Sequence, residues 1–182
     1  MTSNVTHRSS RCLPGTLSLS LSLFLGLLLV LLFLGTARVA VHTAPSFDAA
    51  MNLEVASSIA NGDGYRRSYA QREAFPPEIQ TGAPYILPAA AAFRIWGVAI
   101  PQAQVVNIAY FAMLLATTLL LVARTGSREL ALFAACTVAV VPGLLEFGFR
   151  GYGEIPAIAW VFSATAVFYG DRSRRPLATA FV

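Results

Sequence analysis

The sequence predicts an all-α integral membrane protein with about four transmembrane helices and a helical loop on one side of the bilayer. Of its 182 residues, 56% are hydrophobic and only 12% are charged, a balance that is rare in water-soluble domains. The stretch from Leu17 to Leu34 contains no charged residue. At about 1.5 Å per residue it would span about 27 Å as a helix, close to the thickness of the hydrocarbon core.

The first predicted element is a membrane-spanning helix over residues 17–35, after a cytoplasmic N-terminus over residues 1–16. Its three serines do not forbid burial, because their hydroxyls can bond to carbonyls of the preceding turn. A cleaved signal peptide is the alternative, since Arg8 and Arg11 precede the apolar run; a secreted domain would then begin at Arg38. The run exceeds the roughly 7–15 apolar residues of a signal peptide, which favours an uncleaved helix.

Three further apolar segments predict spans over residues 105–123, 130–146 and 153–169. The segment at residues 130–146 is short and contains Pro142 followed by glycine, and short spans need local thinning of the bilayer or flanking aromatic anchors. Residues 170–182 combine a basic cluster with the opening of another apolar run. We therefore expect them to form a cytoplasmic segment and the start of a truncated span, so that the chain is the N-terminal fragment of a longer protein.

Arginine placement predicts the orientation in the membrane. All thirteen basic residues are arginine, and a cytoplasmic N-terminus places seven of them in three brief cytoplasmic segments. Five of the other six are spread over the long loop at residues 36–104. Arginine density in short loops sets orientation, so the long loop is predicted to lie outside. The arginines form no basic helix or aromatic-interleaved strand, and no nucleic-acid partner is expected.

The long loop is predicted to contain two helices. Ser46 can cap a helix that runs through Ile59, with Met51, Val55 and Ile59 on one face, and the Asn61-Gly pair would end it. The apolar residues 85–98 would form a second helix lying in the membrane interface, because a full span there would break the charge topology.

Asp48 is the first candidate for chemistry, at the start of the predicted loop helix. A carboxylate near the bilayer meets a lowered dielectric constant, which can raise its pKa and its basicity. An acid in the first turn also complements the helix dipole by about 0.3–1 kcal/mol, so a purely structural role stays open.

Glu154 and Arg150 lie at the outer mouth of the last predicted span. An acid on the threshold of a membrane helix is costly to keep there without a role, although Glu154 could be an ordinary first-turn acid ahead of Pro156. Arg150 could pair with it or bind an anion, or its side chain could simply reach the interface. Tyr65 and Tyr152 are candidates for stacking on a sugar, although tyrosines also anchor membrane interfaces.

The sequence contains no phosphate-binding loop, dinucleotide fingerprint, zinc spacing or nucleophile elbow. Three stretches instead resemble the N-terminal part of the GT-C superfamily of polytopic glycosyltransferases: FDAAMNLEVASSIANGDGY, PPEIQTGAPYILPAAAAFRIWG and GYGEIPAIAW. The likeness is to the branch with protein O-mannosyltransferases, the lipid A aminoarabinose transferase and bacterial lipopolysaccharide-core transferases, and it covers most of residues 17–169. The chain departs from that pattern at Ala49, where many members have a second acid, and at Phe75, where a histidine is frequent.

The resemblance implies a glycosyltransferase of the bacterial plasma membrane that moves a sugar from a polyprenyl-phosphate donor to a hydroxyl of a glycan, lipid or protein. It would make Asp48 the catalytic base and Glu154 the second acid of the site, with a divalent metal possible there. Arg150 would counter phosphate charge, and Tyr65 and Tyr152 would contact substrate. The alternative is a non-catalytic small multi-span membrane protein or a transporter fragment. A transporter should place ionisable residues in mid-span, and the predicted spans contain none.

Overall fold

The computed structural model describes residues 15–66, 82–150 and 153–172, and within these ranges the chain is helical with no strand. The helices in these ranges are α1 (Gly15–His42), α2 (Phe47–Ala60), α3 (Ala83–Trp96), α4 (Ile100–Thr125), α5 (Arg128–Ala139), α6 (Pro142–Gly148) and α7 (Glu154–Arg172). The all-helical fold class predicted from the sequence is therefore confirmed for the described residues.

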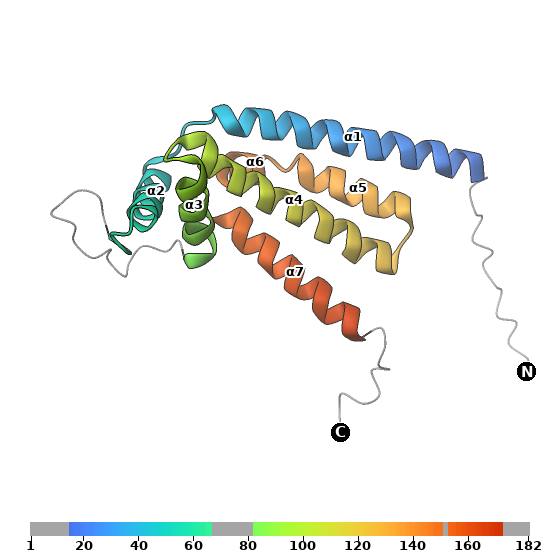
Figure 1. The fold of residues 1–182 in the computed structure, drawn as a ribbon. Helices are drawn as coiled ribbons and strands as arrows, with labels where there is room; N and C mark the ends of the chain where they lie inside the picture. The colour runs from blue at the N-terminus through green and yellow to red at the C-terminus, as the bar shows by residue number, and fades with distance from the viewer. Residues whose placement is uncertain (1–14, 67–81, 151–152, 173–182) are drawn as a thin grey trace, which may run out of the picture.

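Four helices run alternately back and forth along the long axis of the molecule (Figure 1). They are α1, α4, α5 and α7, and α7 diverges from the other three toward its C-terminal end. The helices α2 and α3 lie across one end, which we call the α2–α3 end, and α6 lies toward it. The start of α1, the turn between α4 and α5, and the end of α7 lie at the opposite end.

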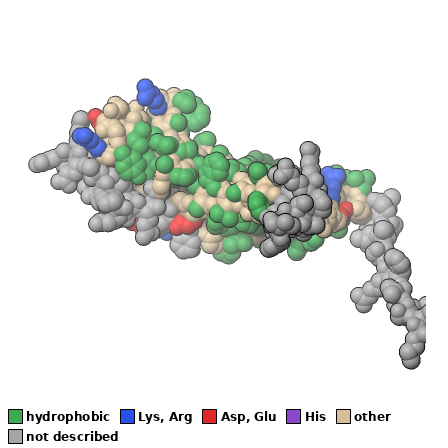
Figure 2. All heavy atoms as spheres, turned by 90° about the horizontal axis from the view of Figure 1, so that it is seen from below, with side chains coloured by type: hydrophobic (Ala, Val, Ile, Leu, Met, Phe, Trp, Pro, Cys, Tyr) green, Lys and Arg blue, Asp and Glu red, His purple; other side chains and the backbone are tan. Residues whose placement is uncertain are grey.

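Two of the described helices are long and apolar enough to cross a membrane, over Ser18–His42 and Ile100–Thr125. Much of α1 is not covered by the rest of the protein, and large side chains such as Leu23, Phe24 and Leu27 are more than 60% exposed. Figure 2 shows apolar side chains over the middle of the molecule, with charged ones toward its two ends. An apolar surface of this kind is typical of contact with lipid or with a partner.

Both long helices extend beyond their predicted bounds. The helix α1 continues past residue 35 to His42, because Gly35 keeps a helical backbone and the following turns pack Ala40 into the core. The helix α4 begins at Ile100 rather than 105, with Pro101 in its first turn, where the missing amide hydrogen costs nothing. Both helices therefore continue beyond the first and second predicted spans, whose bounds in the membrane stay a prediction.

The third predicted span is wrong as a single helix. It divides into α5, which ends at Ala139, and α6, which begins at Pro142. Proline has no amide hydrogen and disfavours the helical conformation of the residue before it, and Val141 accordingly has an extended backbone. At 12 residues, α5 spans only about 18 Å. The helix α7 extends beyond residue 169 to Arg172, and its apolar part is the 15 residues Glu154–Phe168.

The two helices predicted in the long loop are confirmed. The Ser46 hydroxyl caps α2 by accepting a hydrogen bond from the Ala49 amide at 3.2 Å, and Gly62 leaves the helix with φ +87°. Val55 is fully buried against α3, with Met51 and Ile59 packed on the same core cluster. The helix α3 begins two residues earlier than predicted. Its packing on α2 and α4 closes the α2–α3 end.

Candidate functional site

Three of the candidate side chains lie at the α2–α3 end. Asp48 is the second residue of α2, Glu154 is the first residue of α7, and Arg150 lies just after α6. All three side chains are exposed to solvent. Each therefore stands at a helix terminus, where it can meet a ligand without a cost for breaking internal contacts.

A backbone contact joins the two parts of the chain that carry these residues. The backbone amide and the hydroxyl of Ser46 both donate to the Arg150 carbonyl, each at 3.4 Å, across 104 positions of sequence. Asp48 follows Ser46 by two residues in the first turn of α2. The structure thus brings the start of α2 against the chain at Arg150, four positions before Glu154.

Two buried amides lie beneath this contact and were not among the residues predicted from the sequence. Gln104 and Asn107 are 3% and 1% exposed and lie on one face of α4. Gln104 Nε2 donates to the Thr43 carbonyl at 3.3 Å and to the Phe149 carbonyl at 2.7 Å. The signal in the sequence was a polar pair at i, i+3 spacing at the start of a predicted span, a pattern typical of internal hydrogen bonding in membrane helices.

Tyr85 of α3 lies close to this pair. Burial raises the pKa of its phenol to about 12, and the side chain of Asn107 partly offsets that effect. The phenol therefore stays neutral at any physiological pH. It contributes a polar group to the packing between α3 and α4 and no charge to the site.

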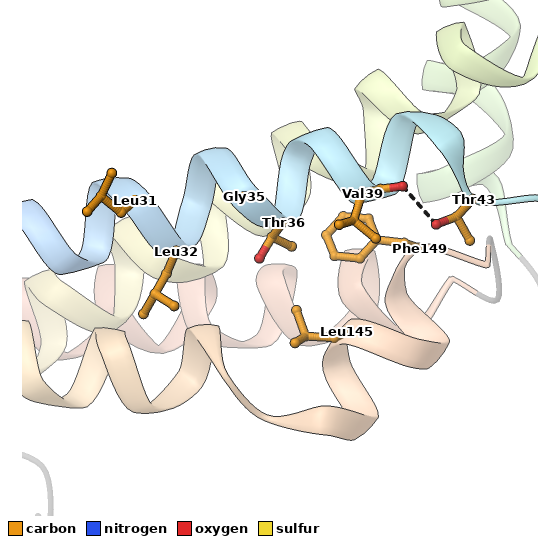
Figure 3. Close-up of a pocket in the computed structure, with 8 residues that line it drawn as sticks. All are labelled: Leu31, Leu32, Gly35, Thr36, Val39, Thr43, Leu145 and Phe149. Carbon is orange, nitrogen blue, oxygen red and sulfur yellow. Dashed lines mark hydrogen bonds between the residues drawn. The ribbon is translucent and has the colours of Figure 1, made fainter.

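An apolar cavity of about 300 Å³ lies between α1 and α6 (Figure 3). It is lined by Leu31, Leu32, Gly35, Thr36, Val39, Thr43, Leu145 and Phe149. Thr43 directly follows α1, and its hydroxyl is turned back onto that helix, donating to the Val39 carbonyl at 2.9 Å. Phe149 precedes Arg150 directly, so the cavity ends beside the contact between Ser46 and Arg150. Its lining suits a hydrocarbon chain.

The remaining site predictions do not join this group. Tyr65 is 44% exposed and lies beyond the C-terminal end of α2, so the length of that helix, about 20 Å, separates it from Asp48. A contact of Tyr65 with substrate stays a prediction. Tyr152 lies outside the described residues. No group of three or more histidine, cysteine, aspartate or glutamate side chains that could hold a metal ion occurs in the part of the chain that the structure describes.

A second polar contact lies at the opposite end of the molecule. The hydroxyls of Ser18 and Ser22 on α1 donate to Glu129 Oε1 in the first turn of α5, with the Ser22 distance at 3.1 Å. From the sequence, these serines were expected to bond within their own helix. The Ser18 hydrogen bond is the largest cause that lowers the pKa of Glu129 to about 2, followed by bonds from its own backbone and from the other serines. The contact holds α1 against α5 through an ionised carboxylate.

Comparisons of the chain with protein-family models, with curated proteins and with solved structures give no match. The function of the chain is therefore inferred from the site itself. Its parts are an exposed acid on α2, a basic residue just after α6, a second acid at the start of α7, and an apolar cavity beside them.

Proposed function

We propose that this chain is the N-terminal part of a GT-C-type glycosyltransferase that moves a sugar from a polyprenyl-phosphate donor to a hydroxyl acceptor. The observation that carries the proposal is the contact of Ser46 with the Arg150 carbonyl. It connects the helix that begins with Asp48 to the segment with Arg150 and Glu154. A base and a phosphate-binding cation would need to meet in this way around one donor headgroup.

The proposed membrane arrangement has four crossings with the N-terminus in the cytoplasm. The alternating directions of α1, α4, α5 and α7 support it (Figure 1). The opposite end carries Arg124 and Arg128, and α7 ends there at Arg172. Cytoplasmic arginines orient membrane proteins, so the α2–α3 end would face outward. In this arrangement α5 and α6 would cross together, with α6 completing a span that α5 is too short to make.

The chemistry at this outer end would be an inverting displacement. Asp48 would take the proton of the acceptor hydroxyl, whose oxygen attacks the anomeric carbon of the donor sugar. The bond from that carbon to the lipid phosphate oxygen breaks, and the phosphate leaves with the bonding electron pair. Arg150 would balance its negative charge, because guanidinium groups form paired hydrogen bonds with phosphate oxygens. Glu154 would hydrogen-bond hydroxyls of the sugar.

The cavity between α1 and α6 would receive the first part of the prenyl chain. Its apolar lining favours an alkyl chain, and Phe149 connects it to Arg150 along the backbone. A donor with its tail there would have its phosphate near Arg150. The tail would also lie against the exposed face of α1, within reach of the surrounding lipid.

The test is Asp48→Asn in the complete protein, assayed with a radiolabelled polyprenyl-phosphate sugar. General base catalysis contributes about 100- to 10,000-fold, so transfer should fall at least about 100-fold. Expression should be unchanged, because Asp48 is exposed and helix-dipole effects are about 0.3–1 kcal/mol. Asp63→Asn, an exposed acid beyond the other end of α2, is the matched control and should keep full transfer. Retained turnover in Asp48→Asn would remove it as the base, and no transfer by the parent protein would favour a non-catalytic membrane protein.

A further inference from the structure

Gln104 and Asn107 take no part in the proposed chemistry, yet both are deeply buried polar side chains near the site. We propose that Gln104, held in one orientation by Asn107, is a positioning residue. Its hydrogen bonds, which we call the clasp, hold together the two segments of the site. The inference deepens the proposed function, because these segments carry Asp48 on one side and Arg150 and Glu154 on the other. The amides would set the distance between the base and the phosphate-binding residues.

The geometry of Gln104 matches this role. A glutamine amide nitrogen has two hydrogens, and here they point to carbonyls from two different segments. One is Thr43, three residues before the cap of α2, at 3.3 Å, and the other is Phe149, directly before Arg150, at 2.7 Å. A single side chain thus joins the segment leading into α2 to the segment leading toward α7.

Asn107 decides which way the Gln104 amide faces. Its Nδ2 donates to Gln104 Oε1 at 3.1 Å, so that oxygen is already engaged. If the Gln104 amide turned over, its hydrogens would face those of Asn107 and both carbonyls would lose their donor. Asn107 Oδ1 is buried and accepts no hydrogen bond from any described residue. Asn107 thus gives up an acceptor contact while its donor contact orients Gln104.

The hydrogen bonds of Gln104 should hold these two segments together more strongly than the hydrogen bonds of Ser46 do. The bonds from Ser46 to the Arg150 carbonyl are 3.4 Å long, near the limit of hydrogen-bond geometry, whereas the bond to the Phe149 carbonyl is 2.7 Å and buried. Loss of the buried donor would leave that carbonyl unsatisfied, which costs more than breaking an exposed bond. We therefore expect the segments to separate when Gln104 or Asn107 can no longer donate.

The experiment measures disulfide formation between Ser46→Cys and Arg150→Cys in the full chain in native membranes, with Cys12 replaced by serine. Added Gln104→Glu, which loses the amide donors, should slow cross-linking about tenfold, equivalent to about 1.4 kcal/mol at 25 °C. Asn107→Asp should give a similar loss, since its carboxylate would attract the Gln104 amide hydrogens away from the carbonyls. Gln102→Glu is the matched control, because among the described residues Gln102 donates to the exposed Trp96 carbonyl at 3.5 Å and to neither segment of the site.

Native Cys136 reports whether each variant is folded. It is 7% exposed and should stay protected from a membrane-permeant thiol reagent. Cross-linking of Gln104→Glu within about twofold of the parent, with Cys136 protected, would overturn the clasp. If Cys136 becomes reactive in that variant, the shorter Gln104→Asn decides by the same rates, because it keeps the amide but cannot reach both carbonyls.

Failure of the clasp and failure of the proposed function are separable. Cross-linking requires no transfer, so a parent without activity still tests the clasp. In an active parent with native Ser46 and Arg150, Gln104→Glu should lower transfer by about the factor found in cross-linking, about tenfold. Asp48→Asn should abolish transfer and leave the cross-linking rate unchanged. Normal transfer in Gln104→Glu despite slowed cross-linking would overturn the positioning role.

Discussion

Replacing Ser46 with alanine removes the cap of α2 and one of its two bonds to the Arg150 carbonyl. The hydroxyl accepts from the Ala49 amide at 3.2 Å and donates to Arg150 at 3.4 Å, so both interactions are lost together. The backbone bond from the Ser46 amide remains. The substitution therefore loosens the first turn of α2, which carries Asp48, without changing any proposed catalytic group.

The expected size follows from these two contacts. Loss of a serine cap costs about 1 kcal/mol. The long bond to Arg150 adds about 0.5 kcal/mol, the low end for a hydrogen bond. The sum of about 1.5 kcal/mol corresponds to about a tenfold higher population of the frayed first turn.

Hydrogen exchange followed by mass spectrometry measures this population directly, because exchange of a protected amide follows its opening equilibrium. Amides in the first turn of α2 should exchange about tenfold faster in Ser46→Ala than in the parent. Ser127→Ala is the matched control, since the Ser127 hydroxyl caps α5 by accepting from the Leu130 amide at the same 3.2 Å. That variant should accelerate exchange in α5 alone.

Unchanged exchange at the start of α2 in Ser46→Ala would refute the reasoning, because the cap would then contribute nothing to the helix. Sugar transfer by the same two variants tests whether order in the first turn of α2 matters for function. Transfer should fall in Ser46→Ala and stay normal in Ser127→Ala, and equal transfer in both would separate α2 order from activity.

Two further predictions concern the opposite end of the molecule and the orientation of the chain. The pKa of Glu129 lies at about 2 instead of 4.5, so its contribution to stability is present above the ordinary carboxyl value and is lost as the pH falls toward 2. The thermal midpoint in detergent should therefore drop on acidification more in the parent than in Glu129→Gln, and parallel pH profiles would contradict the contact. For the orientation, Arg66→Cys should react with an impermeant thiol reagent in intact cells and Arg128→Cys only after permeabilisation; the reverse pattern would overturn the proposed topology.

The local features of the fold followed from short stretches of sequence. Ser46 and the Asn61-Gly pair predicted both ends of α2, because capping depends on residues within one turn. Val55 and its helical neighbours predicted the buried face of the same helix. The break at Pro142 was visible but was read as part of one span, since the apolar run continues across it.

Candidate residues could be named singly but not grouped. Asp48, Arg150 and Glu154 stood out because a charge near a membrane boundary is unusual at any position. Tyr65 stood out because an aromatic ring can stack on a sugar, and it lies beyond the other end of α2 from Asp48. Spacing along the chain cannot tell which of these residues lie together, because the length and direction of the helices decide which loops meet.

The sequence by itself determined that the described chain is helical and apolar along its middle, because helix propensity and side-chain hydrophobicity act within a few residues. Only the tertiary structure decided that Ser46 meets the Arg150 carbonyl, that Gln104 joins two segments, and that Ser18 bonds to Glu129 on another helix. Each of these contacts pairs groups more than forty positions apart. Such pairs form only when the helices pack against one another at one defined alignment. The polar groups buried by that packing then find hydrogen-bond partners on neighbouring segments.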